Sequence, residues 1–482
     1  MFAGREIELD NLERYYKEDA FHFAVFYGRR RVGKTTLINK FRENKPSIYF
    51  AAAETTAKEN LELLSIQILS VLAPEAPLNY FTSFNNAFEY CFKAAMKKRL
   101  VLVIDEYPYL AESDRAVSSL LQALIDKYQN NSRLFLILCG SSMSFMENQV
   151  LGYKSPLYGR RSCQFKIEPF KYYECAPMLS SYNNIEKLTL YGICGGIPEY
   201  IARINSNLSV QQNTQTLFFN PSGRLFEEPS NLLKQELKSP QTYNAIISAI
   251  ASGATKVNEI ASIAGIETSQ CSNMLATLIS LGIVKKEFPA GVDKDSKLSR
   301  KTIYLLADFM FRFWYSFVRP NLSRLEMGFG KTVCEEIFDK STGRIETYMG
   351  LVFEECAMQF LWREMSRLTV PSLGKNNFKS IGRWWGPNQK EKKEEEIDIL
   401  AIEEKEHGSG KASKNALFGE CKWRNSRTGN EILEDLIRKS ELFSVFQKKR
   451  FVIFSKSNFT TQLINIAAQR KDTILIRPDD MC

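Results

Sequence analysis

The segment GRRRVGKT at residues 28–35 has glycines at its first and sixth positions, Gly28 and Gly33. The apolar run FAVFY precedes it and the helical pattern TLINKF follows it, so the local order is strand, loop and helix. In the spacing GxxxxGKT, the two glycines let backbone N–H groups turn toward phosphate oxygens, and the new helix presents its positive amino end to them. The segment therefore predicts a phosphate-binding loop in an α/β fold.

The polar groups of this loop have expected roles toward ATP. Lys34 is expected to reach the terminal phosphates, and the Thr35 hydroxyl is expected to ligate the Mg²⁺ that bridges them. The residues predicted to surround the nucleotide are Gly28, Arg29, Arg30, Arg31, Val32, Gly33, Lys34, Thr35 and Thr36.

A second strand pattern, LVLVIDE at residues 100–106, ends in two acids. A continuous apolar run of this kind is typical of a buried parallel strand. Asp105 is expected to hold Mg²⁺ through water, and Glu106 is expected to polarise the attacking water as a catalytic base. The alternative is a strand that happens to end in solvated carboxylates.

Two further segments carry candidate phosphate contacts. The apolar run LFLILC ends in GSS, and ligands of open α/β sheets gather at the carboxyl ends of strands. Ser141 or Ser142 is therefore a candidate sensor of the terminal phosphate, with a plain turn as the alternative. In LYGRRS, Arg160 or Arg161 is a candidate for neutralising transition-state charge from the same or a neighbouring subunit, with a surface arginine as the alternative.

Several of these segments together resemble the archaeal-type ATPase family, a branch of P-loop NTPases close to the AAA+ and STAND ATPases. They are FAGRE near the amino terminus, YGRRRVGKTTL, LVIDEYPYL, ILCGSS, YGRR and GGIPEYI. The resemblance implies that Gly4 and Arg5 lie near the nucleotide base, and that Pro198 belongs to a helical lid that monitors the nucleotide. Without the resemblance, GGIP predicts only a helix-breaking turn.

The middle of the chain has the spacing of a winged helix. Helical patterns at residues 243–252, 257–264 and 269–281 are followed by IVKKEF, a polar loop and TIYLL, which predict a hairpin. On duplex DNA the third helix would enter the major groove and the hairpin would meet phosphate. The candidate contacts are Ser269, Gln270, Ser272 and Asn273 in the helix and Lys294, Lys297, Arg300 and Lys301 in the hairpin. The alternative is a packing module, because this helix carries no arginine or lysine.

From residue 344 the pattern becomes helix, three strands, helix and strand. In EIDILAI the alternation puts Asp398 on one face, and in ALFGECKW Glu420 and Lys422 share a face because they are two residues apart. Neighbouring strands lie about 4.8 Å apart. Asp398 and Glu420 can therefore converge on one Mg²⁺ with Lys422 beside it, an arrangement suited to phosphodiester hydrolysis.

This spacing resembles the PD-(D/E)XK nuclease core, and the resemblance implies that Glu354 is its helix acid, although the usual proline before the aspartate is absent. The alternative is a hairpin with a salt-bridged Asp, Glu and Lys. The charged run at residues 390–396 is expected to be a solvated loop, and the aromatic segment at 307–320 an interdomain core helix rather than a membrane element.

Length and composition complete the expectations. A chain of 482 residues is too long for one core, and we predict a P-loop ATPase core at 1–168, a helical lid at 169–238, a winged helix at 239–305, linker helices at 306–343 and a nuclease-like domain at 344–482. The net charge of +9 suits a polyanion partner, with a solvated surface as the alternative. Ten cysteines without a CxxC pair support neither zinc nor disulfides. The missing signal peptide and bilayer-length apolar run predict a cytoplasmic protein without a membrane partner.

Two functions compete: a nucleotide-controlled module acting on DNA, and a STAND-like switch that binds nucleic acid or protein without cleaving. A homo-oligomer fits either.

Overall fold

The computed structural model describes residues 3–75, 80–291, 301–367, 370–373, 377–405 and 413–481. The contacts divide the chain into two units, one of Met1–Phe170 with Ile197–Glu199 and one of Lys171–Gly196 with Tyr200–Cys482. Among the described residues, no helix is both long enough and apolar enough to cross a membrane. The domain boundaries proposed within the second unit remain predictions.

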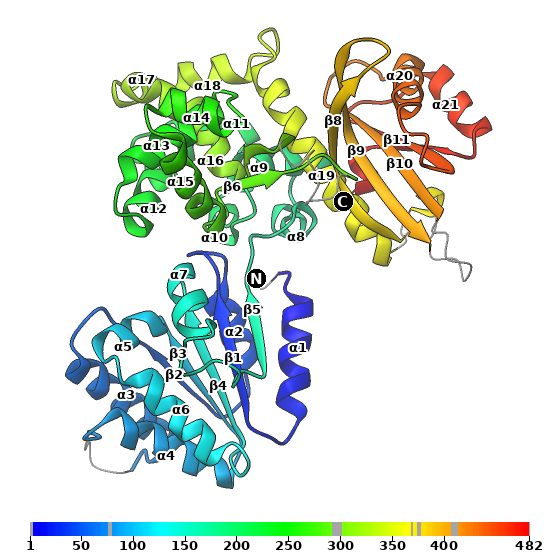
Figure 1. The fold of residues 1–482 in the computed structure, drawn as a ribbon. Helices are drawn as coiled ribbons and strands as arrows, with labels where there is room; N and C mark the ends of the chain where they lie inside the picture. Colours follow the sequence, from blue (N-terminus) through cyan, green and yellow to red (C-terminus); the bar gives the residue numbers. More distant parts are fainter. Residues whose placement is uncertain are drawn as a thin grey trace. The chain divides into compact units, whose positions relative to one another are not determined.

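A five-stranded parallel sheet forms the centre of the first unit (Figure 1). Its order is β2-β3-β4-β1-β5, built from β1 (His22–Tyr27), β2 (Ser47–Ala51), β3 (Leu100–Asp105), β4 (Leu134–Gly140) and β5 (Cys163–Lys166). Every residue of β1, β3 and β4 is buried, which explains why these strands are continuous apolar runs. The predicted parallel α/β sheet is confirmed.

Helices cover both faces of this sheet. Phe135 of β4 meets Tyr16 of α1 (Glu6–Lys17) and Phe41 of α2 (Lys34–Arg42). Its neighbours Leu134 and Leu136 belong to the core on the opposite face, because successive side chains of a strand alternate. The helices that contribute to that core are α3 (Ala57–Leu72), α4 (Phe84–Lys97), α5 (Tyr107–Ser113) and α6 (Val117–Tyr128).

The second unit begins with short helices in the segment predicted to be a lid. These are α8 (Tyr172–Cys175), α9 (Asn184–Cys194), α11 (Val210–Phe218) and α12 (Glu228–Glu236), while α10 (Pro198–Ile201) starts in the first unit. The aromatic segment at 307–320 forms the buried helix α16 (Phe309–Phe313) and a π-helical turn, Trp314–Val318. Helices α17 (Leu322–Glu326) and α18 (Gly330–Phe338) follow.

Three helices and a hairpin occupy the middle of the chain. They are α13 (Pro240–Ala251), α14 (Val257–Ala264), α15 (Thr268–Ser280), β6 (Val284–Glu287) and β7 (Ile303–Leu306). The two strands pair antiparallel, with Val284 opposite Leu306. Three predicted wing residues, Lys294, Lys297 and Arg300, lie outside the described residues.

The carboxyl-terminal part is a mixed five-stranded sheet of order β12-β11-β10-β9-β8, preceded by α19 (Arg344–Arg367) (Figure 1). Strands β8, β9 and β10 pair antiparallel, whereas β10, β11 and β12 pair parallel. The elements after α19 are β8 (Phe378–Asn388), β9 (Lys393–Lys405), β10 (Ser413–Lys422), α20 (Asn430–Ser440), β11 (Lys448–Ser455), α21 (Thr461–Gln469), β12 (Thr473–Ile476) and α22 (Pro478–Met481).

The prediction of a solvated loop at residues 390–396 is wrong for its last four residues. Strand β9 already begins at Lys393, and Glu395 is buried. Arg438 donates hydrogen bonds to both carboxylate oxygens of Glu395, at 2.7 and 3.3 Å. A partner from a distant helix thus removes this carboxylate from solvent, which a local charge pattern does not reveal.

Candidate functional site

The loop between β1 and α2 is shaped by two glycines. Gly33 has φ +90°, and Gly28 has φ +150°. A Cβ on Gly28 would lie 2.3 Å from the Ile167 carbonyl oxygen, so no larger residue fits there. The loop ends where α2 begins at Lys34, so the amino end of a nine-residue helix adjoins it. This geometry is that of an anion-binding loop.

The Lys34 ammonium lies inside the loop. Its Nζ donates to the carbonyl oxygens of Gly28 at 2.7 Å and Arg29 at 2.8 Å, and its side chain is buried. Arg30 donates to the Tyr109 hydroxyl at 3.4 Å. Because this ammonium is buried against the backbone of the loop, it is positioned to contact an anion that binds within the loop.

Asp105 links the loop to the acid-ended strand. Its Oδ2 accepts hydrogen bonds from the Thr35 hydroxyl at 2.9 Å and the Tyr49 hydroxyl at 2.6 Å, while its Oδ1 accepts from the backbone N–H of Glu106. Burial opposes ionisation of Asp105, but hydrogen bonds from Tyr49, Cys139, Thr35 and this N–H outweigh it and lower the pKa of the carboxyl. Asp105 is therefore an anion beside Thr35. The sequence analysis did not single out Tyr49. The available signal was its hydroxyl-bearing side chain within the strand pattern SIYFA of β2.

Glu106 stands at the end of β3 in a left-handed backbone conformation, with φ 49° and ψ 44°. Its carboxylate accepts hydrogen bonds from the Ser141 hydroxyl at 3.0 and 3.1 Å. Ser141 follows β4, the neighbour of β3 in the sheet. The structure thus brings together Glu106 and Ser141, two residues singled out by their positions after strands. Non-glycine residues in this conformation are uncommon and cluster at functional sites.

Arg5 and Pro198, which the family resemblance predicts to lie near the nucleotide, also lie near the phosphate-binding loop. Arg5 donates to the carbonyl oxygen of Val32 at 3.2 Å, and its guanidinium stacks 4.5 Å from the Phe170 ring centroid. Pro198 Cγ would be 3.9 Å from a Cβ on Gly33. Arg5 and Pro198 therefore both lie beside the phosphate-binding loop.

Arg160 is engaged at the surface. It forms a two-point ion pair with Asp126 of α6, with both nitrogen–oxygen distances at 2.7 Å. The hydrogen bond to Asp126 raises the pKa of Arg160. Its Nη1 also donates to the carbonyl oxygens of Pro156 and Tyr158, at 3.0 and 3.3 Å. Among the described residues, Arg160 makes no hydrogen bond to residues 28–35, so its role toward ATP stays a prediction.

A second cluster of charged groups lies on the carboxyl-terminal sheet. The last β9–β10 pair is Ile399 opposite Gly419, and the next residues along the two strands are Asp398 and Glu420. Asp398 Oδ2 accepts from the backbone N–H of Cys421 at 2.8 Å. Burial, followed by repulsion from Glu420 and Glu354, raises the pKa of Asp398 well above its usual value.

Lys422 completes this cluster. Its Nζ lies 2.6 Å from Glu420 Oε1, and Lys439 of α20 lies 3.7 Å from Glu420 Oε2. Burial disfavours the charge of Lys422, but the contact with Glu420 outweighs it and raises the pKa of the ammonium. Lys422 is therefore a cation, which suits orienting a water molecule or a phosphate oxygen better than removing a proton.

Glu354, the expected helix acid, is held by a different partner. Arg383 of β8 donates to Glu354 Oε2 through Nη2 at 2.5 Å and Nε at 3.1 Å. Among the described residues, no group of three or more His, Cys, Asp or Glu side chains is arranged to hold a metal ion. Sequence reasoning missed Arg383, whose only signal was a charge between apolar and aromatic residues.

The helix proposed to read DNA, α15, presents its predicted contacts to solvent. Ser269, Gln270, Ser272 and Asn273 are all exposed. Ser269, Gln270 and Asn273 also border a hollow of about 650 Å³ next to α12 and α13. Lys301, the one described wing residue, lies 3.6 Å from Glu394.

The parallel sheet, the glycine loop after β1 and the acids after β3 define a P-loop ATPase. Residues 2–204 match the model of an ATPase domain predominantly from Archaea, and residues 314–432 match that of archaeal and bacterial proteins of unknown function. The chain belongs to the family of an uncharacterized protein of Methanocaldococcus jannaschii, to which it is 31% identical over 457 residues, 94% of either chain.

Two other similarities are shorter or more distant. An uncharacterized ATP-binding protein of M. jannaschii is 56% identical over 45 residues, which are 9% of this chain and 76% of that protein. Among solved structures, a Walker-type ATPase of Pyrococcus abyssi is 20% identical, with a TM-score of 0.48 over 65% of this chain and 96% of that one.

Proposed function

We propose that the chain is a Mg²⁺-dependent ATPase whose nucleotide state controls a winged-helix and nuclease-like module acting on DNA. The observation that carries the ATPase part is the 2.9 Å hydrogen bond between Thr35 and Asp105, which joins the phosphate-binding loop to the acid-ended strand. These oxygen ligands suit Mg²⁺, which prefers hard oxygen donors.

In this proposal each side chain has one task. The terminal phosphates replace the carbonyls of Gly28 and Arg29 as acceptors for Lys34, so that its charge faces the triphosphate. Bound Mg²⁺ supplies neutralisation of the phosphate charge. Glu106, held by Ser141, accepts a proton from a water whose oxygen attacks the terminal phosphorus, and the bond to the leaving ADP oxygen breaks. The products are ADP and phosphate.

Calorimetric titration of ATP with Mg²⁺ tests the nucleotide site. Lys34→Ala should abolish measurable binding, because the loop then lacks the buried ammonium that is expected to contact the terminal phosphates. Lys40→Ala, at the far end of the same helix and exposed, is the matched control and should bind normally. Unchanged ATP affinity of folded Lys34→Ala would contradict the proposed site.

The DNA-acting part rests on two observations in the second unit. The exposed polar residues at the start of α15 are suited to base edges, and the cluster of Asp398, Glu420 and Lys422 carries the charges that metal-assisted phosphodiester cleavage uses. ATP hydrolysis would then reset the arrangement of these elements, because the terminal phosphate is the contact that differs between nucleotide states.

Cleavage of plasmid and linear DNA in Mg²⁺, with and without ATP, tests this part. Lys422→Ala should cut DNA at least about 100-fold more slowly if Lys422 orients the attacking water. Lys414→Ala is the matched control, since Lys414 lies on the same strand and pairs with Glu404 instead. Equal cutting by the Lys422 variant would remove the nuclease assignment.

A second candidate, a STAND-like switch that does not cut, is favoured by the ion pair between Glu354 and Arg383. In this pair Arg383 holds the carboxylate that the resemblance to nucleases expects as the helix acid. No cutting of any DNA together with nucleotide-dependent oligomerisation would support the switch. Loss of cutting in Asp398→Ala with DNA affinity retained would support the nuclease.

A further inference from the structure

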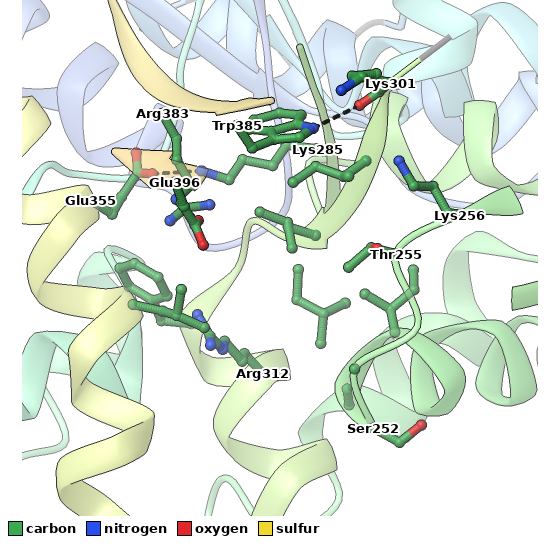
Figure 2. A pocket seen from close by; sticks show the side chains of 18 of the residues that line it. Ser252, Thr255, Lys256, Lys285, Lys301, Arg312, Glu355, Arg383, Trp385 and Glu396 are labelled. Carbon is green, nitrogen blue, oxygen red and sulfur yellow. Dashed lines mark hydrogen bonds and ion pairs between the residues drawn. The ribbon is translucent and has the colours of Figure 1, made fainter. Parts of the chain in front are cut away.

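The second unit contains a cavity of about 850 Å³ that shares no residue with the phosphate-binding loop (Figure 2). Its wall comes from the end of α13, the start of α14, both hairpin strands, α16, α19, β8 and β9. Its apolar surface includes Ile250, Ile303, Leu305, Phe309, Leu351 and Trp385. The rest of the wall is polar or charged, and a cavity of this volume with both apolar and polar walls is suited to a small molecule.

Most charges on this wall are already neutralised within the protein. The Lys285 ammonium lies 2.5 Å from carboxylate oxygens of both Glu287 and Glu355. Arg383 pairs with Glu287, Glu354 and Glu396, as Figure 2 shows in part. Lys301 pairs with Glu394. These groups need no ligand to satisfy their charge.

Arg312 and Lys256 differ from the other cations of the wall. Among the described residues, no carboxylate lies within ion-pair distance of either. The Arg312 guanidinium lies over the Tyr348 ring at 5.3 Å, and Lys256 Nζ makes a long contact of 3.5 Å with the Thr302 carbonyl. Burial lowers the pKa of Arg312, yet an arginine stays charged in proteins. Within the described part of the chain, neither cation is held in an ion pair, although the Glu354 carboxylate still acts electrostatically on Arg312.

We propose that this cavity binds a small organic phosphate ester, with Arg312 contacting the phosphate oxygens and the apolar wall contacting the organic group. A guanidinium presents a planar fork of donors that matches an oxyanion in two-point contact. A phosphate monoester carries a charge of about −1.5 to −2 at neutral pH. This charge is larger than that of a carboxylate, so a phosphate monoester gains more than a carboxylate from contact with the Arg312 guanidinium.

Isothermal titration of the full chain with 1-naphthyl phosphate tests the proposal. Binding is expected for the wild type and is expected to weaken by about tenfold or more in Arg312→Gln, because a charge-assisted contact is lost. Lys301→Gln removes a cation from the same wall that already has Glu394 as its partner, so its affinity should change little. Lys34→Ala should bind the probe as the wild type does, because the P-loop is not its site.

Two comparisons make the result decisive. 1-Naphthoate has the same ring and one negative charge, so it should bind more weakly than the phosphate. Arg312→Gln should still melt in a cooperative transition, so that weaker binding by this variant reports the lost guanidinium and not an unfolded protein. The proposal is overturned if folded wild type does not bind the probe at millimolar concentration, if Arg312→Gln binds it equally, if Lys34→Ala loses it, or if naphthoate binds as tightly.

Discussion

Two carboxylates follow one another at the end of β3, and their contacts give them different chemistry. Asp105 is surrounded by donors, whereas the Glu106 carboxylate is held by Ser141. Glu106→Gln should therefore keep ATP affinity and lower turnover by about 100-fold to 10,000-fold, since the proton acceptor is lost. Steady-state phosphate release and ATP titration measure the two quantities. Glu112 is an exposed acid of α5, so Glu112→Gln should match the wild type in turnover and in ATP affinity. A Glu106→Gln variant that hydrolyses ATP at the wild-type rate would exclude Glu106 as the base.

Because His22 is buried, we expect the stability of the first unit to depend on pH. Burial lowers its pKa from 6.5, although Glu18 at 3.3 Å opposes the shift. Because the folded pKa is depressed, the unfolded chain binds the proton more strongly, so stability is full above pH 6.5 and falls as the pH drops toward the folded pKa. His22→Phe keeps the ring beside Tyr15 and Phe135 and should flatten this dependence. Urea unfolding between pH 7.5 and pH 5, at about half-unit intervals, measures it; an unchanged slope in the variant would assign the effect elsewhere.

At the scale of elements, Arg383 joins β8 to β6, α19 and β9 through Glu287, Glu354 and Glu396. Its side chain is buried, so Arg383→Met leaves carboxylates without their counter-ion and should lower the free energy of unfolding by about 3–5 kcal/mol. Arg324→Met, which removes an exposed pair with Glu336, should cost much less. Chemical denaturation compares the two. Arg383→Met with Glu354→Gln should recover part of the loss, and no recovery would mean that the pair is not coupled.

Some of these structural features could be predicted from the sequence and others could not. The P-loop and the acids of β3 were predictable because each depends on a few consecutive residues after an apolar strand. The sequence predicted that Glu106 and Ser141 lie at the same edge of the sheet. It did not predict that their strands are neighbours, which brings the two side chains into contact. The Arg383 ion pairs and the burial of Glu395 were not, because their partners are far apart in sequence. The cavity around Arg312 likewise exists only once segments that are far apart in the sequence have packed together.

At the scale of the whole molecule, the two candidate ligand sites belong to different units. The phosphate-binding loop lies in the first unit, and the Arg312 cavity is formed entirely by the second. Chains with separate units commonly depart from two-state unfolding, because each unit has its own core. A ligand stabilises the part of the chain that binds it by an amount that grows with its concentration relative to its dissociation constant.

Scanning calorimetry of the full chain should therefore show two transitions that respond to different ligands. ATP with Mg²⁺ at about 100 times its dissociation constant should stabilise the first unit by about 2.7 kcal/mol and leave the other transition in place. 1-Naphthyl phosphate should move only the transition that ATP leaves unchanged. Lys34→Ala should lose the first shift and keep the second, and Arg312→Gln should do the reverse. A single transition raised by both ligands would instead mean that the two units unfold together as one cooperative block.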